Sequence, residues 1–387
     1  MLKNSGNIKT SQKRSNLNEK GVPKGTVRSQ YGEGGTELGV QRTSFSEVSR
    51  ICLVGGGTGG HIMPILSLVA HLPISRESFF WLGGNASMEE TKAQEANIRF
   101  IPITTYKLTS TKSLGVLLYP FKLLQGVLDA RKILKQEQPK LVFSKGGPGS
   151  VAVGVAAWTL NIPLYIHESD TVPGFSNKVL GHFATQIFLG FEEAQKWFPK
   201  NKTTVVGQIL HPDFFAKNPV GNINWKTEKK HIFVSCGSQG SRKIFQTLLE
   251  QKKNFPDTEW IISLGTLNGN LRDKFEQWEN TQIFDWIPQS DIPHILDDTD
   301  IAITRASATT LAELATRPIH LIIIPLAISA GNHQLYNAKA YEKMGNTMIL
   351  EQDLEKVNLG EIIFSNHPKK ISYMDEKILP LLKIFQK

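Results

Sequence analysis

The chain has 387 residues, of which 40% are apolar and 20% are charged, and its formal net charge is +9. This length predicts more than one domain. The two cysteines, Cys52 and Cys236, exclude a disulfide-rich scaffold and indicate a reducing compartment. No apolar run reaches the ~18–20 residues that cross a bilayer, so we expect a protein that is soluble or peripheral to a membrane.

The first 50 residues differ in composition from the rest of the chain. They carry nine Lys and Arg against four Glu and have few large apolar side chains. Such a segment cannot bury a core, so residues 1–49 are predicted to be a disordered basic extension. It also lacks the apolar stretch of a secretory signal. A solvated extension is the simplest interpretation, with a tether to an anionic surface as the alternative.

From residue 51 onward, short apolar strands alternate with helical stretches. The first series of predicted strands comprises Ile51–Val54, Ser78–Leu82, Arg99–Ile103, Leu141–Ser144, Leu164–His167, Gln186–Leu189 and Thr203–Val206. The second comprises His231–Ser235, Glu259–Ser263, Gln282–Phe284, Ile301–Thr304, Ile319–Ile324 and Thr347–Leu350. Predicted helices lie between them, at Met63–His71, Val116–Gln136, Gly149–Leu160, Arg242–Lys252, Thr309–Ala315 and Gln334–Lys343.

This alternation predicts an α/β protein with mostly parallel sheets and helices on both faces. Because the series restarts after a polar stretch, we predict two Rossmann-like domains, over residues 50–212 and 231–372, joined by a linker at 213–230. Residues 373–387 are predicted to form a C-terminal helix that packs back on the first domain. In such sheets ligands bind at the carboxyl ends of the strands.

The turn at Gly55–His61 follows the first strand and reads GGGTGGH. Its glycines allow a phosphate to approach the backbone, and His61 adds a group that titrates near neutral pH. The spacing Gly55-x-Gly57-x-x-Gly60 also fits a dinucleotide fingerprint. That fingerprint requires an acid at the end of the next strand, but the first acid there, Glu89, comes only after the turn. A nicotinamide or flavin oxidoreductase is therefore a disfavoured alternative.

Four further segments follow predicted strands and carry candidate side chains. His167–Glu168 ends an apolar strand, and Ser238-Gln239-Gly240 forms a second glycine turn suited to phosphate. Glu313 fits either a ribose acceptor or a capping box with Thr310, and Asn332 fits either a ligand contact or a helix cap. Amides near Asn332 and Asn337 suit a nucleobase or sugar hydroxyls. No metal-binding motif or Ser nucleophile elbow is present, so we expect no metal and no cofactor.

Together these segments resemble the MurG family of UDP-N-acetylglucosamine transferases. The similarity covers Arg50 to the C-terminus. Its blocks are GGGTGGHIMP (Gly55–Pro64), SKGGPGSVAVGVAAW (Ser144–Trp158), IPLYIHES (Ile162–Ser169), PGFSNK (Pro173–Lys178), GSQGSRK (Gly237–Lys243), ITRASATTLAEL (Ile303–Leu314) and NHQLYNA (Asn332–Ala338).

The resemblance implies a GT-B fold, in which two Rossmann-like domains face each other across a cleft. It also implies an inverting transfer of GlcNAc from UDP-GlcNAc to the 4-hydroxyl of lipid I, undecaprenyl-pyrophosphoryl-MurNAc-pentapeptide, giving lipid II. His61 or Glu168 would be the catalytic base. Carried over by motif, Thr58, Gly59 and Gly60 would lie near the diphosphate and sugar, Ser238 and Gln239 would meet the phosphates, and Ile287 the uracil. Ala308, Thr309, Thr310, Leu311 and Ala312 would meet the nucleotide, Glu313 the ribose, and His333 with Gln334 the sugar hydroxyls.

Several positions depart from the family pattern, in the segments His167–Asp170, Gly207–His211 and Arg305–Ala308. Asp170 replaces an Asn that helps to bind donor or acceptor, His211 replaces a phosphate-facing Arg, and Ser307 replaces a Gly. These departures leave open a transferase with another acceptor, or a catalytically silent protein that binds sugar nucleotides.

A polyprenyl acceptor requires contact with a bilayer. The segment Tyr106–Lys135 offers apolar side chains beside Lys107, Lys112, Lys122, Arg131 and Lys132. This pattern suits peripheral docking on an anionic membrane surface, with a core-facing helix as the alternative. We expect the cytoplasmic face of the bacterial plasma membrane, no nucleic-acid partner, and contacts with proteins of cell-wall synthesis.

Overall fold

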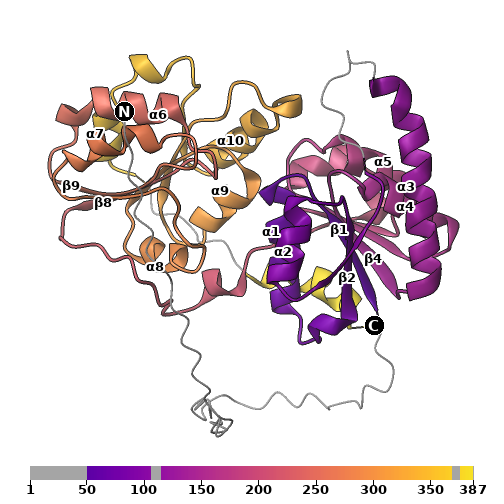
Figure 1. Ribbon diagram of the computed structural model, residues 1–387. Helices are drawn as coiled ribbons and strands as arrows, with labels where there is room; N and C mark the ends of the chain where they lie inside the picture. Colours follow the sequence, from indigo (N-terminus) through magenta and orange to yellow (C-terminus); the bar gives the residue numbers. More distant parts are fainter. Residues whose placement is uncertain (1–49, 106–114, 368–374, 387) are drawn as a thin grey trace, which may run out of the picture. The chain divides into compact units, whose positions relative to one another are not determined.

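The computed structural model describes residues 50–105, 115–367 and 375–386. The predicted extension over residues 1–49 lies outside this part. Within it, the chain forms two parallel sheets with helices on both faces of each (Figure 1). The predicted fold class is confirmed.

The first sheet has seven parallel strands in the order β3-β2-β1-β4-β5-β6-β7. Its strands are β1 Ile51–Gly55, β2 Phe79–Gly83, β3 Arg99–Pro102, β4 Leu141–Gly146, β5 Leu164–Glu168, β6 Gln186–Leu189 and β7 Thr203–Val205. Its helices are α1 Gly59–His71, α2 Met88–Glu95, α3 Gly115–Glu137, α4 Ser150–Thr159 and α5 Phe175–Phe183.

Strand β1 is buried at every position because both faces of the sheet are covered. Ile51 and Leu53 pack in a cluster with α1 and α2. Cys52 and Val54 point to the opposite face, where they pack with α3, α4 and α5. The alternation of side chains along the strand thus supplies two separate cores.

The second sheet has six parallel strands in the order β10-β9-β8-β11-β12-β13. They are β8 Lys230–Ser235, β9 Thr258–Ser263, β10 Thr281–Phe284, β11 Ile301–Thr304, β12 His320–Ile323 and β13 Thr347–Met348. The accompanying helices are α6 Arg242–Glu250, α7 Arg272–Glu276, α8 Ile292–Asp297, α9 Ala308–Leu314, α10 His333–Lys343 and α11 Leu359–Phe364. Clusters built on Phe233 and on Ile232 fill the two faces.

All thirteen predicted strands form, but the helix predictions are less complete. The prediction that the first helix starts at Met63 is wrong, because α1 begins at Gly59. Gly59 and Gly60 have low helix propensity, so the sequence did not indicate that they form the first turn of the helix. The prediction also omitted α2, α5, α7, α8 and α11. Helix α2 has few apolar residues, and α7 and α8 are too short to show a helical period.

The segment after residue 374 contributes to the core of the first sheet. Ile378, Leu381 and Phe385 are buried in the cluster that contains Ile51, and the Phe385 ring lies edge-on to Phe143 with ring centroids 5.8 Å apart. Here α12 Leu379–Leu382 continues into short 3-10 turns at both ends.

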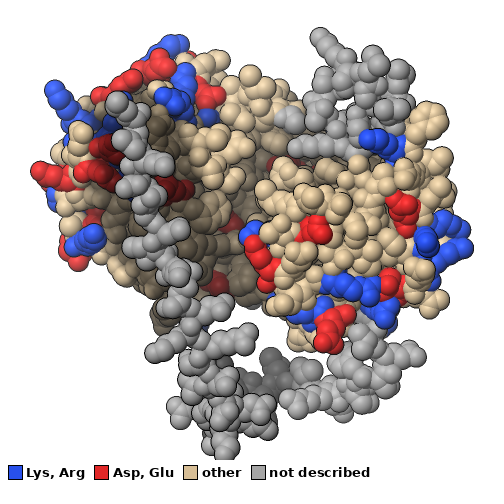
Figure 2. Space-filling model, in the orientation of Figure 1, with Lys and Arg blue, Asp and Glu red and all other residues tan. Residues whose placement is uncertain are grey.

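Helix α3 turns one face to the sheet and one to solvent. Gly126, Ala130 and Leu134 are buried, at helical spacing, whereas Phe121, Leu124 and Leu128 are exposed on the opposite face. That exposed face continues into Lys132 and Lys135, and basic side chains gather along this edge of the molecule in Figure 2. No helix in the described ranges has the length and apolarity to cross a membrane.

Candidate functional site

Each sheet has one point at which the strand order reverses direction. In the first sheet it lies between β1 and β4, and in the second between β8 and β11. Loops leaving such neighbouring strands run to opposite sides and leave room for a ligand between them. Thr58 and His61 follow β1, Ser238 and Gln239 follow β8, and Ala308 follows β11, so these predicted site residues lie beside the two reversal points.

The glycine turn after β1 is occupied in part by a side chain of the protein itself. Glu89 of α2 is buried, and its carboxylate accepts hydrogen bonds from the Gly57 amide at 3.1 Å and the Gly84 amide at 3.4 Å. A Cβ on Gly56 would lie 2.4 Å from this carboxylate. The Gly57 amide therefore already binds an anion, and a second negative charge beside it is disfavoured. This arrangement argues against the dinucleotide interpretation of the turn.

Beyond Gly57 the same turn is open. Thr58, Gly59 and Gly60 are exposed, and a Cβ on Gly59 would meet nothing within 4 Å. His61 lies in the first turn of α1, and its Nδ1 is 3.0 Å from the Gly56 carbonyl and 3.1 Å from Thr58 Oγ1. A proton on Nδ1, donated to Gly56, leaves Nε2 as an unprotonated acceptor. Burial lowers the pKa of His61, and the nearby Lys145 charge lowers it further.

A glycine loop at the end of β4 packs directly on the glycine turn that follows β1. Gly146, Gly147 and Gly149 all have positive φ, and a Cβ on Gly147 would lie 2.3 Å from the Gly56 carbonyl oxygen. Only glycine allows this approach of the two backbones.

The end of β5 holds a buried cluster of polar side chains beneath these loops. The ammonium of Lys145 lies 2.7 Å from His167 Nδ1 and donates to Ser169 Oγ at 2.6 Å. His167 Nε2 donates in turn to the Gly207 carbonyl at 2.9 Å. Burial lowers the pKa of His167 far below its usual value, with the Lys145 charge acting in the same direction, so this imidazole is neutral.

Glu168 is buried and uses both carboxyl oxygens within the protein. One accepts from the Asp170 amide at 2.8 Å, and the other accepts from the Gly174 amide and from Asn177 Nδ2. Burial raises the pKa of Glu168 to about 7, and the neighbouring Asp170 acts in the same direction. These bonds fix the loop between β5 and α5.

Asn337 of α10 joins that loop to the second sheet. Its Oδ1 accepts from the Thr171 amide and hydroxyl, both at 3.0 Å, and its Nδ2 donates to Asp170 Oδ1 at 2.7 Å and to the Ala306 carbonyl at 3.2 Å. His333 Nδ1 lies 3.6 Å from Asp170 Oδ2. Asp170 and His333, both predicted site residues, are therefore neighbours.

In the glycine turn after β8, hydrogen bonds fix the backbone carbonyls while the side chains are exposed to solvent. The Ser238 carbonyl accepts from Thr266, and the Gln239 carbonyl accepts from the buried Asn268 side chain at 2.9 Å. The side chains of Ser238 and Gln239 are exposed. The turn thus presents polar groups on a rigid backbone.

Arg305 ties this turn to its neighbours. Its guanidinium donates to Ser241 Oγ, to the Ile324 and Pro325 carbonyls and to Glu351. Gln334 joins the same region, because its Oε1 accepts from the amides of Ala306 and Leu326.

The sequence left two capping alternatives open, and neither forms a side-chain cap in the structure. The N-cap of α9 is Ser307, so Thr310 lies inside the helix and forms no capping box with Glu313. The Glu313 carboxylate instead accepts from Gln289 Nε2 at 3.1 Å, and burial raises its pKa to about 7. Asn332 precedes α10 in a left-handed conformation, but its side chain makes no cap hydrogen bond.

The remaining predicted site residues differ in exposure. Ala308, Leu311 and Ala312 are buried in α9, whereas Thr309 and Thr310 are half-buried. Ile287 is buried in the core cluster built on Phe233. His211 makes a local contact, with its Nδ1 3.1 Å from an Asp213 oxygen, and no bond joins it to another predicted site residue in the described ranges.

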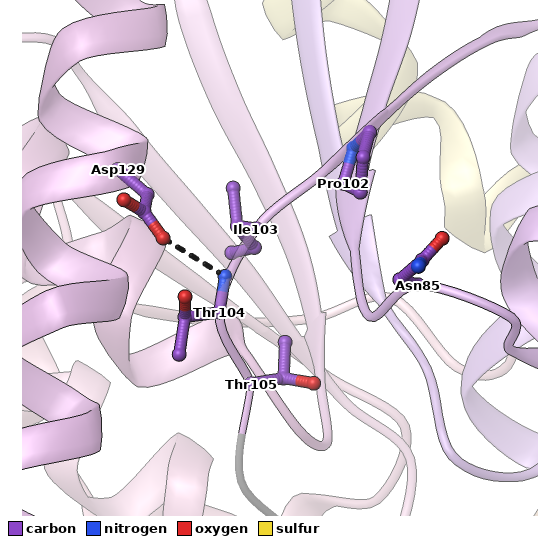
Figure 3. Close-up of a pocket in the computed structure, with 6 residues that line it drawn as sticks. All are labelled: Asn85, Pro102, Ile103, Thr104, Thr105 and Asp129. Atoms are coloured by element: carbon purple, nitrogen blue, oxygen red, sulfur yellow. Dashed lines mark hydrogen bonds between the residues drawn. The ribbon is translucent and has the colours of Figure 1, made fainter.

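A pocket of about 470 Å³ lies at the carboxyl ends of β2 and β3 (Figure 3). It is lined by Asn85, Pro102, Ile103, Thr104, Thr105 and Asp129. The Asp129 carboxylate, from α3, accepts from the Thr104 amide at 3.1 Å. Residues 106–114, the first part of the predicted docking segment Tyr106–Lys135, follow Thr105 and lie outside the described residues. No cluster of acidic, His or Cys side chains suited to a metal occurs in the part of the chain that is described.

Sequence reasoning missed Lys145, Glu89 and the linking role of Asn337. The available signal for Lys145 was a lysine directly after the run Leu141–Ser144, since a charge in a buried strand is rare. Glu89 was considered only as an acidic residue that lies outside the position required by a dinucleotide-binding fingerprint.

Comparison with known proteins places this arrangement in a family. Residues 51–189 match the glycosyltransferase family 28 N-terminal domain, and residues 231–365 match the C-terminal domain of that family. The UDP-N-acetylglucosamine--N-acetylmuramyl-(pentapeptide) pyrophosphoryl-undecaprenol N-acetylglucosamine transferase of Staphylococcus carnosus is 34% identical over 83% of this chain and 89% of its own length. The chain belongs to the MurG family of glycosyltransferases.

A second relative supports this assignment, and two solved structures share the fold. The transferase of the same name from Staphylococcus haemolyticus is 34% identical over 81% of this chain and 90% of its own length. The crystal structure of Acinetobacter baumannii MurG matches with a TM-score of 0.67 at 22% identity, covering 87% of this chain and 99% of that one. The calicheamicin glycosyltransferase CalG4 matches with a TM-score of 0.57 at 13% identity, covering 87% and 94%. The GT-B fold expected from the resemblance is confirmed.

The packing of the two glycine loops gives a stability prediction. Gly147→Ala would force a side chain into a left-handed conformation and against the Gly56 carbonyl, so we expect the free energy of unfolding to fall by about 2 kcal/mol or more. Gly59→Ala is the matched control, because its Cβ would enter open space, and it should change this free energy by less than ~0.5 kcal/mol. Urea denaturation of both variants measures the difference, and equal losses would contradict the packing argument.

Proposed function

We propose that this chain transfers N-acetylglucosamine from UDP-N-acetylglucosamine to the 4-hydroxyl of lipid I, with inversion at the anomeric carbon, to give lipid II. The observation that carries the proposal is the 34% identity to a transferase so named, over 89% of that protein's length. Residues 231–372 would form the donor domain and residues 50–212 the acceptor domain. The open glycine turns and the free Nε2 of His61 supply the groups that such a transfer needs.

In this reaction the acceptor hydroxyl oxygen attacks the anomeric carbon as the bond from that carbon to the UDP oxygen breaks. The bonding electron pair leaves with the β-phosphate, and the hydroxyl proton passes to a base. His61 suits the role of base because its Nδ1 is held by Gly56 and its Nε2 is an unprotonated acceptor. A lowered pKa keeps the ring neutral at physiological pH. Thr58, Gly59 and Gly60 would lie beside the reacting groups.

Glu168 is the second candidate base, but its geometry suits a supporting role better. Both of its oxygens accept hydrogen bonds from the loop that follows β5. It would therefore shape the acceptor side of the site rather than receive the proton.

Removal of the base gives the first test of the proposed reaction. His61→Ala should lower kcat about 10²–10⁴-fold and leave the KM for UDP-GlcNAc nearly unchanged, because general-base assistance is lost while donor binding is kept. Glu168→Gln should lower kcat less. UDP release and lipid II formation from lipid I measure both. Near-normal turnover in His61→Ala and in Glu168→Gln would contradict both base assignments, and no turnover by the unaltered protein would favour a silent binding protein.

The donor would bind at the carboxyl edge of the second sheet. Ser238 and Gln239 lie on a rigid, exposed turn and would contact the phosphates, with Ala308, Thr309, Thr310, Leu311 and Ala312 beside the nucleotide. Ile287 would contact the uracil, and His333 with Gln334 the sugar hydroxyls. Asp170 and His211 would reach the donor from the first domain. Glu313 would accept hydrogen bonds from the ribose.

The raised pKa of Glu313 makes this contact dependent on pH. Ribose hydroxyls donate more strongly to an ionised carboxylate than to a carboxyl, and Glu313 ionises only as the pH rises through about 7. We therefore expect the affinity for UDP to increase several-fold between pH 6 and pH 8 relative to Glu313→Gln, which shares the titration of UDP itself. Calorimetric titration of both proteins with UDP measures this, and parallel pH profiles would contradict the contact.

We further propose that the protein docks on the cytoplasmic face of the plasma membrane through α3. The exposed side of this helix presents Phe121, Leu124 and Leu128 and then Lys132 and Lys135. Arg131 bonds the Thr159 carbonyl, which places the exposed Trp158 of α4 next to the same helix. Apolar side chains flanked by lysines suit an anionic interface. Lys107 and Lys112, expected to contribute, lie outside the described residues.

Vesicle binding tests the docking surface. Phe121→Ser with Leu124→Ser should weaken binding to phosphatidylglycerol vesicles about tenfold or more, because two exposed apolar side chains no longer enter the interface. Lys132→Glu with Lys135→Glu should weaken it at low salt and less so at high salt. Val220→Ser, which removes a 90% exposed side chain of the predicted linker, is the control and should change nothing. Unchanged co-sedimentation of both double variants would contradict docking through α3.

A further inference from the structure

Lys145 occupies an irregular position in the first sheet. Val54 of β1 pairs with Ser144, but the next residue, Gly55, pairs with Gly146, so Lys145 has no partner on β1. Such a bulge turns a side chain away from the regular alternation of the strand and is common beside active sites. Gly55 makes room for it, since a Cβ there would lie 3.0 Å from the Lys145 Cβ.

The ammonium of Lys145 is buried without an ion-pair partner. The side chain is only 2% exposed, and the Nζ contacts two neutral acceptors, His167 Nδ1 and Ser169 Oγ. Within the described ranges, no carboxylate forms a salt bridge with it. Burying an ammonium in this way is costly, so its presence next to a candidate site suggests a role in the reaction.

Several charged or titratable groups surround His61. Lys145 comes from β4, Asp170 from the loop after β5, and Glu89 from α2, while His167 and Glu168 end β5. Lys145 disfavours a proton on His61, and Asp170 and Glu89 favour one. Burial lowers the pKa of Lys145 to about 8, so the ammonium keeps its charge in most molecules at neutral pH.

We propose that Lys145 is a positioning residue for the transfer: its buried ammonium orients His167 and Ser169 beneath the glycine loops and, together with burial of the ring, keeps the His61 imidazole uncharged. This inference rests on the proposed function of His61 as the base. A positive charge under the loops, present in most molecules at neutral pH, lets His61 remain an acceptor at a lower pH than it would otherwise. Above about pH 8, loss of the Lys145 proton removes this charge, while the neutral amine retains two N–H donors for His167 and Ser169.

The experiment measures the titration of His61 directly and its effect on catalysis separately. In NMR titrations of ¹⁵N-histidine protein, assigned with His61→Ala, Lys145→Met should raise the His61 midpoint by at least about 0.5 pH unit. The acid limb of kcat/KM should move by the same amount, which lowers kcat/KM relative to the plateau by up to about threefold at pH values well below the midpoint. Lys178→Met removes an exposed lysine that lies over Trp197, and it should move neither curve.

A second variant keeps the test valid if Lys145→Met does not fold. Asp170→Asn removes the opposing negative charge and should shift the His61 midpoint to lower pH. A folded Lys145→Met protein with an unmoved His61 midpoint would overturn the proposal, as would an unmoved or raised midpoint in Asp170→Asn. The NMR result does not depend on turnover. If the midpoints move as expected but the unaltered protein transfers no sugar, the proposed function fails while the electrostatic role of Lys145 stands.

Discussion

The close approach of two glycine loops organises the first sheet and its site. Gly147 lies so near the Gly56 carbonyl that no side chain fits between them, and this contact fixes the loop after β4 against the turn after β1. The carbonyl of Gly56 is then held in place to orient His61. Because β1 and β4 are neighbours at the point where the strand order reverses, the topology itself brings these loops together.

The charges in this region are balanced through buried groups rather than exposed ion pairs. Glu89 closes part of the first turn, Lys145 lies beneath it, and Glu168 holds the loop that carries Asp170. Glu89 and Glu168 accept hydrogen bonds from backbone amides and from the Asn177 side chain, and Lys145 donates to two neutral side chains. In a buried environment such groups interact strongly with one another, so the protonation state of His61 depends on residues that need not touch the substrate.

The fold could be predicted from the sequence more completely than the site. Apolar runs such as Ile51–Val54 and Ile301–Thr304 are long enough to specify buried parallel strands, and all thirteen formed. Short or weakly apolar helices such as α2 and α7 show no helical spacing of apolar residues, so they were not predicted. The glycine turns lie after β1 and β8, as the order of strands along the sequence predicted. Contacts between distant segments, such as Glu89 with Gly57 or Asn337 with Asp170, leave no local pattern, so only the three-dimensional structure revealed them.

The return of residues 375–386 to the first sheet affects how the protein folds. Phe385 packs against Phe143, and Ile378 and Leu381 complete the cluster that contains Ile51. During synthesis on the ribosome, the second sheet emerges before these side chains do. One apolar face of the first sheet therefore remains incomplete until a segment that begins 170 residues after Val205 reaches it. Such long-range closure slows folding and leaves apolar surface of the first sheet exposed to water during that interval.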